Sequence, residues 1–317
     1  MALLTCQRLW IEQFTAWAKA RDDVRAALVV GSHGRTDHYP PDEWSDVDVL
    51  FVTTEPKRYV GDNAWMHDIG SFWTGVMSPH ETFGDLLPVF CGFSVYEGGL
   101  GVDFFILSNA RTKWMTRAIR LLNRYPVLRR CLPGSVASLG AEAGDIFRHG
   151  ARVLFDKDSL AEQLVQATRA VPVTPPSPPS RQVFQREIDD FWVGPTRVAA
   201  YLRRGQLMAA MKLVDSGKRF LARWMEWHAR AKNDWQDDGV SYRLKWIDRW
   251  ADPRALAALP GIHARYETGD MWRALFEMMD LFRWLAAETA DLLGYDYSPD
   301  VGTKISAWVE QCYVEIE

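Results

Sequence analysis

The sequence has 317 residues, which is enough for two domains of ordinary size. Hydrophobic residues make up 48% of the chain and charged residues 25%, values typical of a globular protein with a real core, so a disordered or fibrous chain is excluded. The formal net charge is −4, spread evenly along the chain, which argues against a nucleic-acid-binding domain on bulk charge.

The four cysteines are scattered and have no paired spacing that would suit zinc or redox chemistry, so we expect reduced thiols in a cytoplasmic protein. The chain contains no run of about 18 apolar residues. Charged residues interrupt its N-terminus, unlike a signal peptide. We therefore expect no membrane or nucleic-acid partner. We also expect a monomer.

The first predicted elements are a helix and a strand. Apolar residues recur at helical spacing over about residues 5–20, which predicts an amphipathic helix that covers a sheet. The apolar run of residues 28–30 predicts a strand that ends at Gly31 and Ser32. The polar loop of residues 33–44 that follows is long for a connection between strands, and long ordered loops tend to be functional.

The next predicted strand, residues 47–52, carries two carboxylates near its start, Asp46 and Asp48. Residues two apart in a strand point to the same side, so these carboxylates should project into one space. Two neighbouring carboxylates suit Mg²⁺, which leaves its other positions to water and substrate phosphate. The sequence therefore predicts a magnesium site at this strand.

A third carboxylate, Asp103, lies in a predicted β-hairpin. Residues 88–96 and 101–107 are apolar and rich in β-formers, and a glycine turn separates them. A lone charge inside an apolar strand is costly to bury without a partner. We therefore expect Asp103 to face the same cleft as Asp46 and Asp48.

Less regular segments flank this hairpin. Residues 56–87 are rich in glycine and proline, which predicts a helix near residues 59–67 and loops elsewhere. Residues 111–130 contain seven basic side chains and no acids. A solvated helix face is favoured there over a nucleic-acid or triphosphate surface, because the rest of the domain has no matching basic stripe. Residues 151–155 predict one more strand.

The C-terminal part of the chain is predicted to be a separate helical domain. Five prolines among residues 171–180 indicate a stiff joint between domain 1–170 and domain 181–317. The helical patterns beyond the joint cover about residues 181–202, 207–232, 246–251, 255–259 and 270–293. Pro195 should kink or split the first of these helices. The predicted class is α+β: a mixed sheet flanked by helices, followed by a helical bundle.

The spacing of these motifs resembles a known superfamily. Gly31-Ser32, then thirteen residues, then Asp46-x-Asp48 and the later Asp103 resemble the DNA polymerase β-like nucleotidyltransferases. Further segments, in matching order from about residue 25 to residue 297, resemble the aminoglycoside 6-adenylyltransferases, also called streptomycin adenylyltransferases. They are residues 42–48, 65–70, 96–103, 153–158, 190–193 and 198–202. That family usually has Arg directly after Gly-Ser, where this chain has His33, with Arg35 two residues later.

The resemblance implies an antibiotic-resistance enzyme that uses ATP and two Mg²⁺ ions to adenylylate an aminoglycoside such as streptomycin. The expected metal ligands are Asp46, Asp48 and Asp103. The expected nucleotide-binding residues are Gly31, Ser32, His33 and Arg35, and the expected acceptor-binding residues are Asp189, Asp190, Phe191 and Trp192. A sugar hydroxyl must lose its proton as it attacks phosphorus, and we expect Asp190 to be the general base, with Asp189 as its rival.

Two other functions stay open on the sequence alone. A nucleotidyltransferase could act on a protein or on an RNA end, and the basic run would favour RNA, whereas the net acidity of the chain argues against it. A degenerate member of the superfamily could instead bind ATP as a sensor without catalysis. The complete set of three Asp residues weighs against the sensor, because a sensor has no need of a second metal.

Overall fold

A computed structural model describes residues 2–35, 40–80, 89–131, 144, 147, 150–172, 176–236, 240 and 244–314. The chain forms two compact units, which we call the sheet unit (Met1–Val173) and the helical unit (Thr174–Glu317). The predicted joint at residues 171–180 includes residues 173–175, which lie outside the described residues. Among the described helices, none combines the length and the apolar character that crossing a membrane requires.

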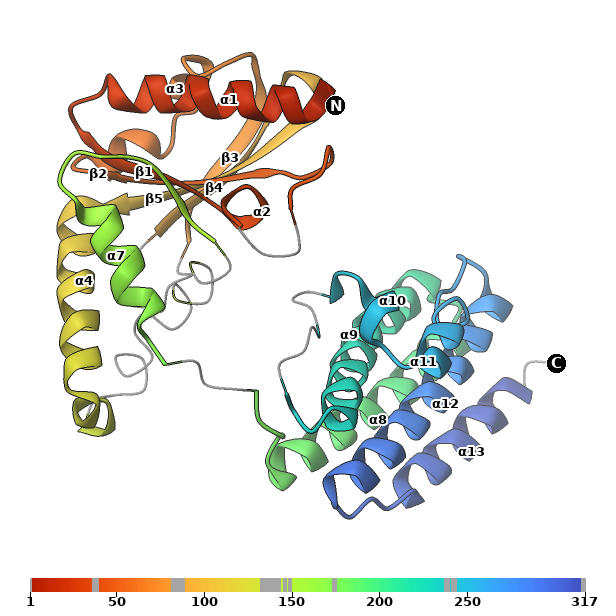
Figure 1. The fold of residues 1–317 in the computed structure, drawn as a ribbon. Helices are drawn as coiled ribbons and strands as arrows, with labels where there is room; N and C mark the ends of the chain where they lie inside the picture. Colours follow the sequence, from red (N-terminus) through yellow and green to blue (C-terminus); the bar gives the residue numbers. More distant parts are fainter. Residues whose placement is uncertain are drawn as a thin grey trace. The chain divides into compact units, whose positions relative to one another are not determined.

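The sheet unit is built on six strands in the order β3-β4-β5-β2-β1-β6 (Figure 1). They are β1 (Val24–Val30), β2 (Val47–Thr53), β3 (Phe72–His80), β4 (Val89–Tyr96), β5 (Leu100–Ser108) and β6 (Arg152–Asp156). β2 and β5 run parallel, and the other neighbouring pairs run antiparallel. The sheet is therefore mixed, which confirms the predicted class and the predicted hairpin.

Helices cover both faces of this sheet (Figure 1). α1 (Ala2–Lys19) packs on one face, and α4 (Asn109–Arg124) and α7 (Leu160–Arg169) pack on the other. Leu50 and Val52 of β2 are buried on the side of α4 and α7. Asp48 shares their face, because alternate residues of a strand point the same way, but it is only partly buried. One end of this face is thus packed with helices, and the other presents carboxylates.

The segment before the hairpin differs from the prediction of one helix and loops. Two short helices, the 3-10 helix η1 (Pro56–Tyr59) and α3 (Ala64–His67), replace the single helix, and β3 follows them as an unpredicted strand. Gly75 and Pro79 obscure its β pattern. An edge strand tolerates both residues, because one side of its backbone needs no partner strand. Two further 3-10 helices are η2 (Glu97–Gly99) and η3 (Pro126–Cys131).

The helical unit has α8, α9 and α12 packed against one another, with α13 against α8. Its helices are α8 (Arg181–Arg203), α9 (Leu207–Lys232), α10 (Ile247–Trp250), α11 (Pro253–Ala258), α12 (Thr268–Leu293) and α13 (Asp300–Val314). The predicted bundle is confirmed, and α13 is an addition to it. Of the expected kink or split at Pro195, the split is wrong, because α8 continues through this residue. Pro195 is buried in the bundle, and packing offsets the lost backbone hydrogen bond.

Candidate active site

Three carboxylates meet at one end of the central strands. Asp48 in β2 lies directly opposite Asp103 in parallel β5, and Asp46 immediately precedes β2. One oxygen atom of each residue lies within 4.8 Å of the other two. Asp46 is exposed, whereas Asp48 and Asp103 are partly buried. The structure thus brings together the three residues that the sequence placed in one cleft, and we call them the carboxylate triad.

A tight turn lies beside the triad, where β1 ends. Val30 pairs with Asp48 across the sheet, and the next four residues form the single helical turn α2 (Gly31–Gly34), which we call the Gly-Ser turn. Gly31 has a φ of +57°, and a Cβ atom added to it would overlap the carboxylate of Asp48. Only glycine therefore allows this backbone to approach the triad so closely.

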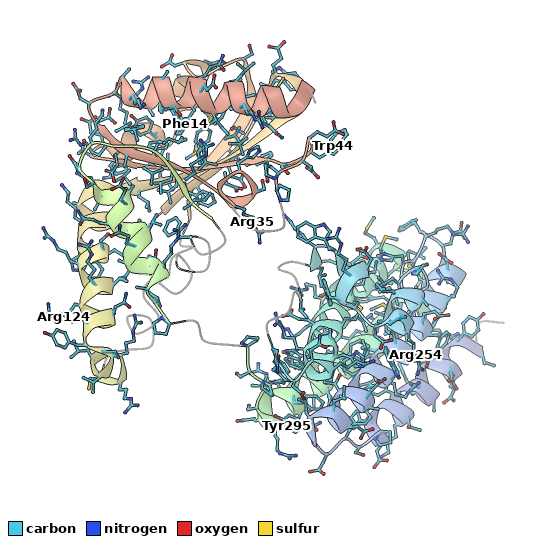
Figure 2. All side chains as sticks on the ribbon, in the orientation of Figure 1. Phe14, Arg35, Trp44, Arg124, Arg254 and Tyr295 are labelled. Carbon is cyan, nitrogen blue, oxygen red and sulfur yellow. The ribbon has the colours of Figure 1, made fainter. Side chains whose placement is uncertain are left out.

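Two polar side-chain atoms of the Gly-Ser turn make no hydrogen bond to the described residues. Ser32 Oγ and His33 Nε2 are buried and have no hydrogen-bond partner among the described residues. The pKa of His33 lies below its usual 6.5, mainly because burial disfavours the charged ring; the charge of Arg152 acts in the same direction and that of Asp46 opposes it. The ring is therefore mostly neutral at neutral pH. Arg35 caps the end of α2 and brings a permanent charge to this segment (Figure 2).

The loop that leads into Asp46 is ordered by a residue that the sequence did not single out. Gln7 of α1 is 2% exposed, and its Nε2 atom donates to the carbonyl oxygen of Ser45 at 2.6 Å and to that of Asp42 at 3.3 Å. The carboxylate of Asp42 accepts from Trp44 N at 3.0 Å and from Ser45 Oγ at 2.9 Å. The loop therefore holds Asp46 in place, and Trp44, two residues earlier, is 81% exposed (Figure 2).

A signal for Gln7 does exist in the sequence. It lies three and four residues before Trp10 and Ile11, both of which are buried against the sheet. A polar side chain on the buried stripe of a helix needs a hydrogen-bond partner. The partner itself could not be predicted, because it lies 35 to 38 residues away in a loop.

The donor set of the triad fits a hard divalent cation such as Mg²⁺. All three side chains offer carboxylate oxygens, the ligand type that Mg²⁺ prefers. Ser32 Oγ, in the turn that begins at Gly31 against Asp48, has no hydrogen-bond partner among the described residues and is a polar atom for a phosphate. These residues could therefore hold a metal and the phosphates that it binds.

The acceptor residues expected on α8 divide into two kinds. Phe191 and Trp192 are 3% and 1% exposed, and both lie in the core of the helical unit. The Phe191 ring stacks on Phe282 with the ring centres 3.6 Å apart, and Trp192 meets the same ring edge-on. Both of these expected acceptor-binding rings are therefore packed inside the helical unit, and neither presents a face to solvent.

The two acids on α8 are exposed. Asp189 accepts a hydrogen bond from Gln185 at 3.0 Å, and the Asp190 carboxylate lies 3.6 Å from Arg186. The Asp190 side chain is 52% exposed. Both acids remain available to a ligand in solvent.

Comparisons with known proteins agree with the motifs. Residues 7–312 match the family model described as streptomycin adenylyltransferase. The aminoglycoside 6-adenylyltransferase of Bacillus subtilis (strain 168) is 24% identical over 318 residues, covering 94% of this chain and 95% of that protein. The enzyme of the same name from Campylobacter jejuni is 22% identical over 304 residues, covering 92% and 91%.

A solved structure is also similar, that of an aminoglycoside 6-adenyltransferase from Bacillus subtilis. It has a TM-score of 0.41 and 18% identity, and covers 96% of this chain and 97% of that one. The match to the family model spans nearly the whole sequence, from α1 to α13. The chain therefore belongs to the streptomycin adenylyltransferase family.

Proposed function

We propose that this protein transfers AMP from ATP to a hydroxyl group of an aminoglycoside and releases pyrophosphate. The observation that carries the proposal is the meeting of three carboxylates beside the Gly-Ser turn, in a chain whose family is named for streptomycin adenylylation. The names of both curated relatives support an aminoglycoside as the acceptor.

In this proposal, Asp46, Asp48 and Asp103 are the ligands of two Mg²⁺ ions. The ions, when bound, would lower the pKa of the attacking hydroxyl and offset the negative charge that develops around the α-phosphate. Paired strands hold Asp48 and Asp103 in fixed register, and the Gln7 hydrogen bonds fix the loop before Asp46. The protein therefore sets the ligand positions in advance, which lowers the cost of organising the site.

The Gly-Ser turn would bind the triphosphate. Its backbone N–H groups and the unpartnered Ser32 hydroxyl are donors for phosphate oxygens. We assign His33 to the same site as a neutral ring and Arg35 as a cation. The missing side chain of Gly31 lets these donors lie next to the triad, so that phosphate and metal ligands converge.

The acceptor needs acids and a base. An aminoglycoside carries several positive charges, and the exposed Asp189 and Asp190 would attract it. We keep Asp190 as the proposed general base, with Asp189 as the alternative. The three Asp residues of the triad are committed to metal in this proposal, so we expect a separate carboxylate to take the proton of the hydroxyl.

The test is pyrophosphate release by the purified protein with ATP, Mg²⁺ and a panel of aminoglycosides that includes streptomycin. We expect release to require both an aminoglycoside and Mg²⁺, to stop with EDTA, and to yield an adenylylated drug by mass spectrometry. Without an acceptor, release should stay at background. A protein that binds ATP and Mg²⁺ yet releases no pyrophosphate with any aminoglycoside would contradict the proposal.

A further inference from the structure

A row of four side chains crosses the sheet at the level of the triad. Val76 in β3 lies opposite Phe93 in β4, Phe93 lies opposite Asp103 in β5, and Asp103 lies opposite Asp48 in β2. Residues directly opposite in neighbouring strands share a face and lie about 5 Å apart. We call Val76, Phe93, Asp103 and Asp48 the cross-sheet row. Its two apolar members continue the surface that carries the carboxylates.

The apolar half of the row is exposed. Phe93 is 51% and Val76 is 67% exposed, although both are large hydrophobic side chains in the middle of strands. A Cβ atom added to Gly101 would lie 3.3 Å from Phe93 Cε2 and Cζ and 3.7 Å from Asp46 Cβ. The Phe93 ring and Asp46 therefore flank Gly101 from two sides. The ring is a neighbour of the triad rather than a distant surface residue.

The in-line geometry of the transfer indicates which substrate lies against this surface. The Gly-Ser turn, the proposed triphosphate site, lies on the β1 side of the triad, and Phe93 and Val76 lie on its β4 and β3 side. In phosphoryl-type transfer the attacking and leaving oxygens lie roughly in line on opposite sides of phosphorus. If pyrophosphate leaves toward the Gly-Ser turn, the acceptor hydroxyl must approach from the side of Phe93.

We propose that Phe93 and Val76 form the surface on which a sugar or cyclitol ring of the aminoglycoside lies as its hydroxyl reaches the triad. This inference rests on the proposed function. The C–H face of such a ring packs on an aromatic ring, and ammonium or guanidinium groups are attracted to the face of an aromatic ring and to carboxylates. The exposed Phe93 ring next to the triad offers one cationic ligand both a surface for its sugar ring and an aromatic face for its positive charge.

The test compares variants of Phe93 in steady-state kinetics with the aminoglycoside that the wild-type protein accepts. Phe93→Ala should raise the KM for the aminoglycoside about 10-fold or more and change the KM for ATP less than about twofold. Phe93→Tyr keeps the ring and should stay close to wild type. Trp114→Ala is the matched control, because Trp114 is also 51% exposed but lies on α4, and its kinetics should not change.

A charge pair at Val76 tests the same surface without removing a ring. Val76→Lys should raise the KM for the cationic aminoglycoside and Val76→Glu should lower it, and added salt should shrink both effects. Because Val76 is 67% exposed, either charged side chain can lie in solvent and the variant protein should still fold. If the nucleotide occupied this surface instead, Val76→Lys would lower the KM for ATP.

The possible outcomes separate this inference from the function on which it rests. A wild-type protein that is inactive with every aminoglycoside overturns the proposed function and this inference with it. An active wild type whose Phe93→Ala and Val76→Lys variants keep the wild-type KM for the aminoglycoside overturns this inference alone. A change in the KM for ATP alone also overturns this inference. Variants at both residues that change the KM for the aminoglycoside but not the KM for ATP support it.

Discussion

At the scale of single residues, the exposure of each carboxylate decides what its removal should do. Asp46 is exposed and Asp48 is only partly buried, and neither contributes to an apolar cluster. Replacing either with Asn keeps the shape of the side chain and removes the negative charge. The free energy of unfolding should therefore change little, because no packing is lost.

We predict that Asp46→Asn or Asp48→Asn lowers kcat by roughly 10³-fold or more, because each variant loses a proposed metal ligand. The measurement is pyrophosphate release at saturating ATP and aminoglycoside, alongside thermal unfolding. Asp68→Asn, which alters a surface ion pair with Arg21, is the control and should keep its activity. Near-full activity of either variant with Mg²⁺ would show that the metal assignment is wrong.

The assignment of the general base gives a second prediction. Asp190→Asn should lower turnover by roughly 10² to 10⁴ and leave ATP binding unchanged, because only proton removal from the acceptor is affected. Asp189→Asn is the matched variant, one residue away on the same exposed stretch of α8. A collapse of turnover in Asp189→Asn alone would move the role to that residue. Normal turnover in both variants would remove the base from α8.

The residues that the sequence placed well are those fixed by strand geometry. Asp48 lies in β2 and Asp46 immediately precedes that strand, so the two-residue spacing and the strand direction predict that the two carboxylates lie close together. The side on which Phe191 lies depends instead on the rotation of α8 against the bundle, and sequence could not supply that rotation. Phe93 was overlooked, although counting outward from the glycine turn pairs it with Asp103.

At the scale of elements, the Gly-Ser turn depends on a missing side chain. Gly31→Ala should abolish most of the activity, because its Cβ would overlap the carboxylate of Asp48 and the φ of +57° adds backbone strain. Gly205→Ala is the matched control: Gly205 has a φ of +68°, but a Cβ there meets no other atom within 4 Å. Both variants should lose some stability in thermal unfolding, and only Gly31→Ala should lose pyrophosphate release. Equal activity in the two variants would contradict the close approach.

The start of α12 gives a prediction on pH. Asp270 accepts from Arg273 Nε at 2.9 Å and from the backbone N of Arg265 at 2.6 Å, and the Arg273 bond, followed by the Arg265 bond, lowers the pKa of Asp270 from 3.8 to about 2. A carboxylate whose pKa is lower in the folded than in the unfolded protein stabilises the folded state at pH values above the unfolded pKa. This stabilisation is lost as pH falls through the folded pKa. Asp270→Asn should therefore lower Tm at pH 6, and the difference from wild type should shrink as pH falls from about 4 through about 2. A difference in Tm that persists unchanged at pH 2 would show that the charge is not the cause.

Elements with strong periodicity could be predicted, and weakly patterned ones could not. The 26 residues of α9 were predicted in full, because apolar residues repeat along the whole helix. β3 could not be predicted, because glycine and proline interrupt its β pattern and because it forms by backbone pairing with β4, which the local sequence does not show. The local preference against proline predicts a kink or a split of α8 at Pro195, but the helix is not split there, because tertiary packing outweighs that preference.

At the scale of the whole molecule, the two units have separate hydrophobic cores. The core of the helical unit is formed by buried residues that lie between positions 184 and 309. The two clusters on the faces of the sheet are formed by buried residues between positions 10 and 171. Proposed metal and triphosphate ligands all belong to the sheet unit, whereas the proposed base belongs to the helical unit. A core defect in the helical unit should therefore affect the acceptor step while leaving the ATP site folded.

Trp224→Ala tests this independence. Trp224 is fully buried, and its ring lies 4.8 Å from that of Phe184 and 5.1 Å from that of Phe282. Replacing it should destabilise the helical unit by about 3–5 kcal/mol, the usual cost of an emptied aromatic site. Hydrogen exchange measured by mass spectrometry should then speed up in α8, α9 and α12 and stay unchanged in β1, β2 and β5, with ATP binding preserved. An equal loss of protection from hydrogen exchange in the strands would show that the two units unfold together. The proposal that ATP binding is independent of the stability of the helical unit would then be wrong.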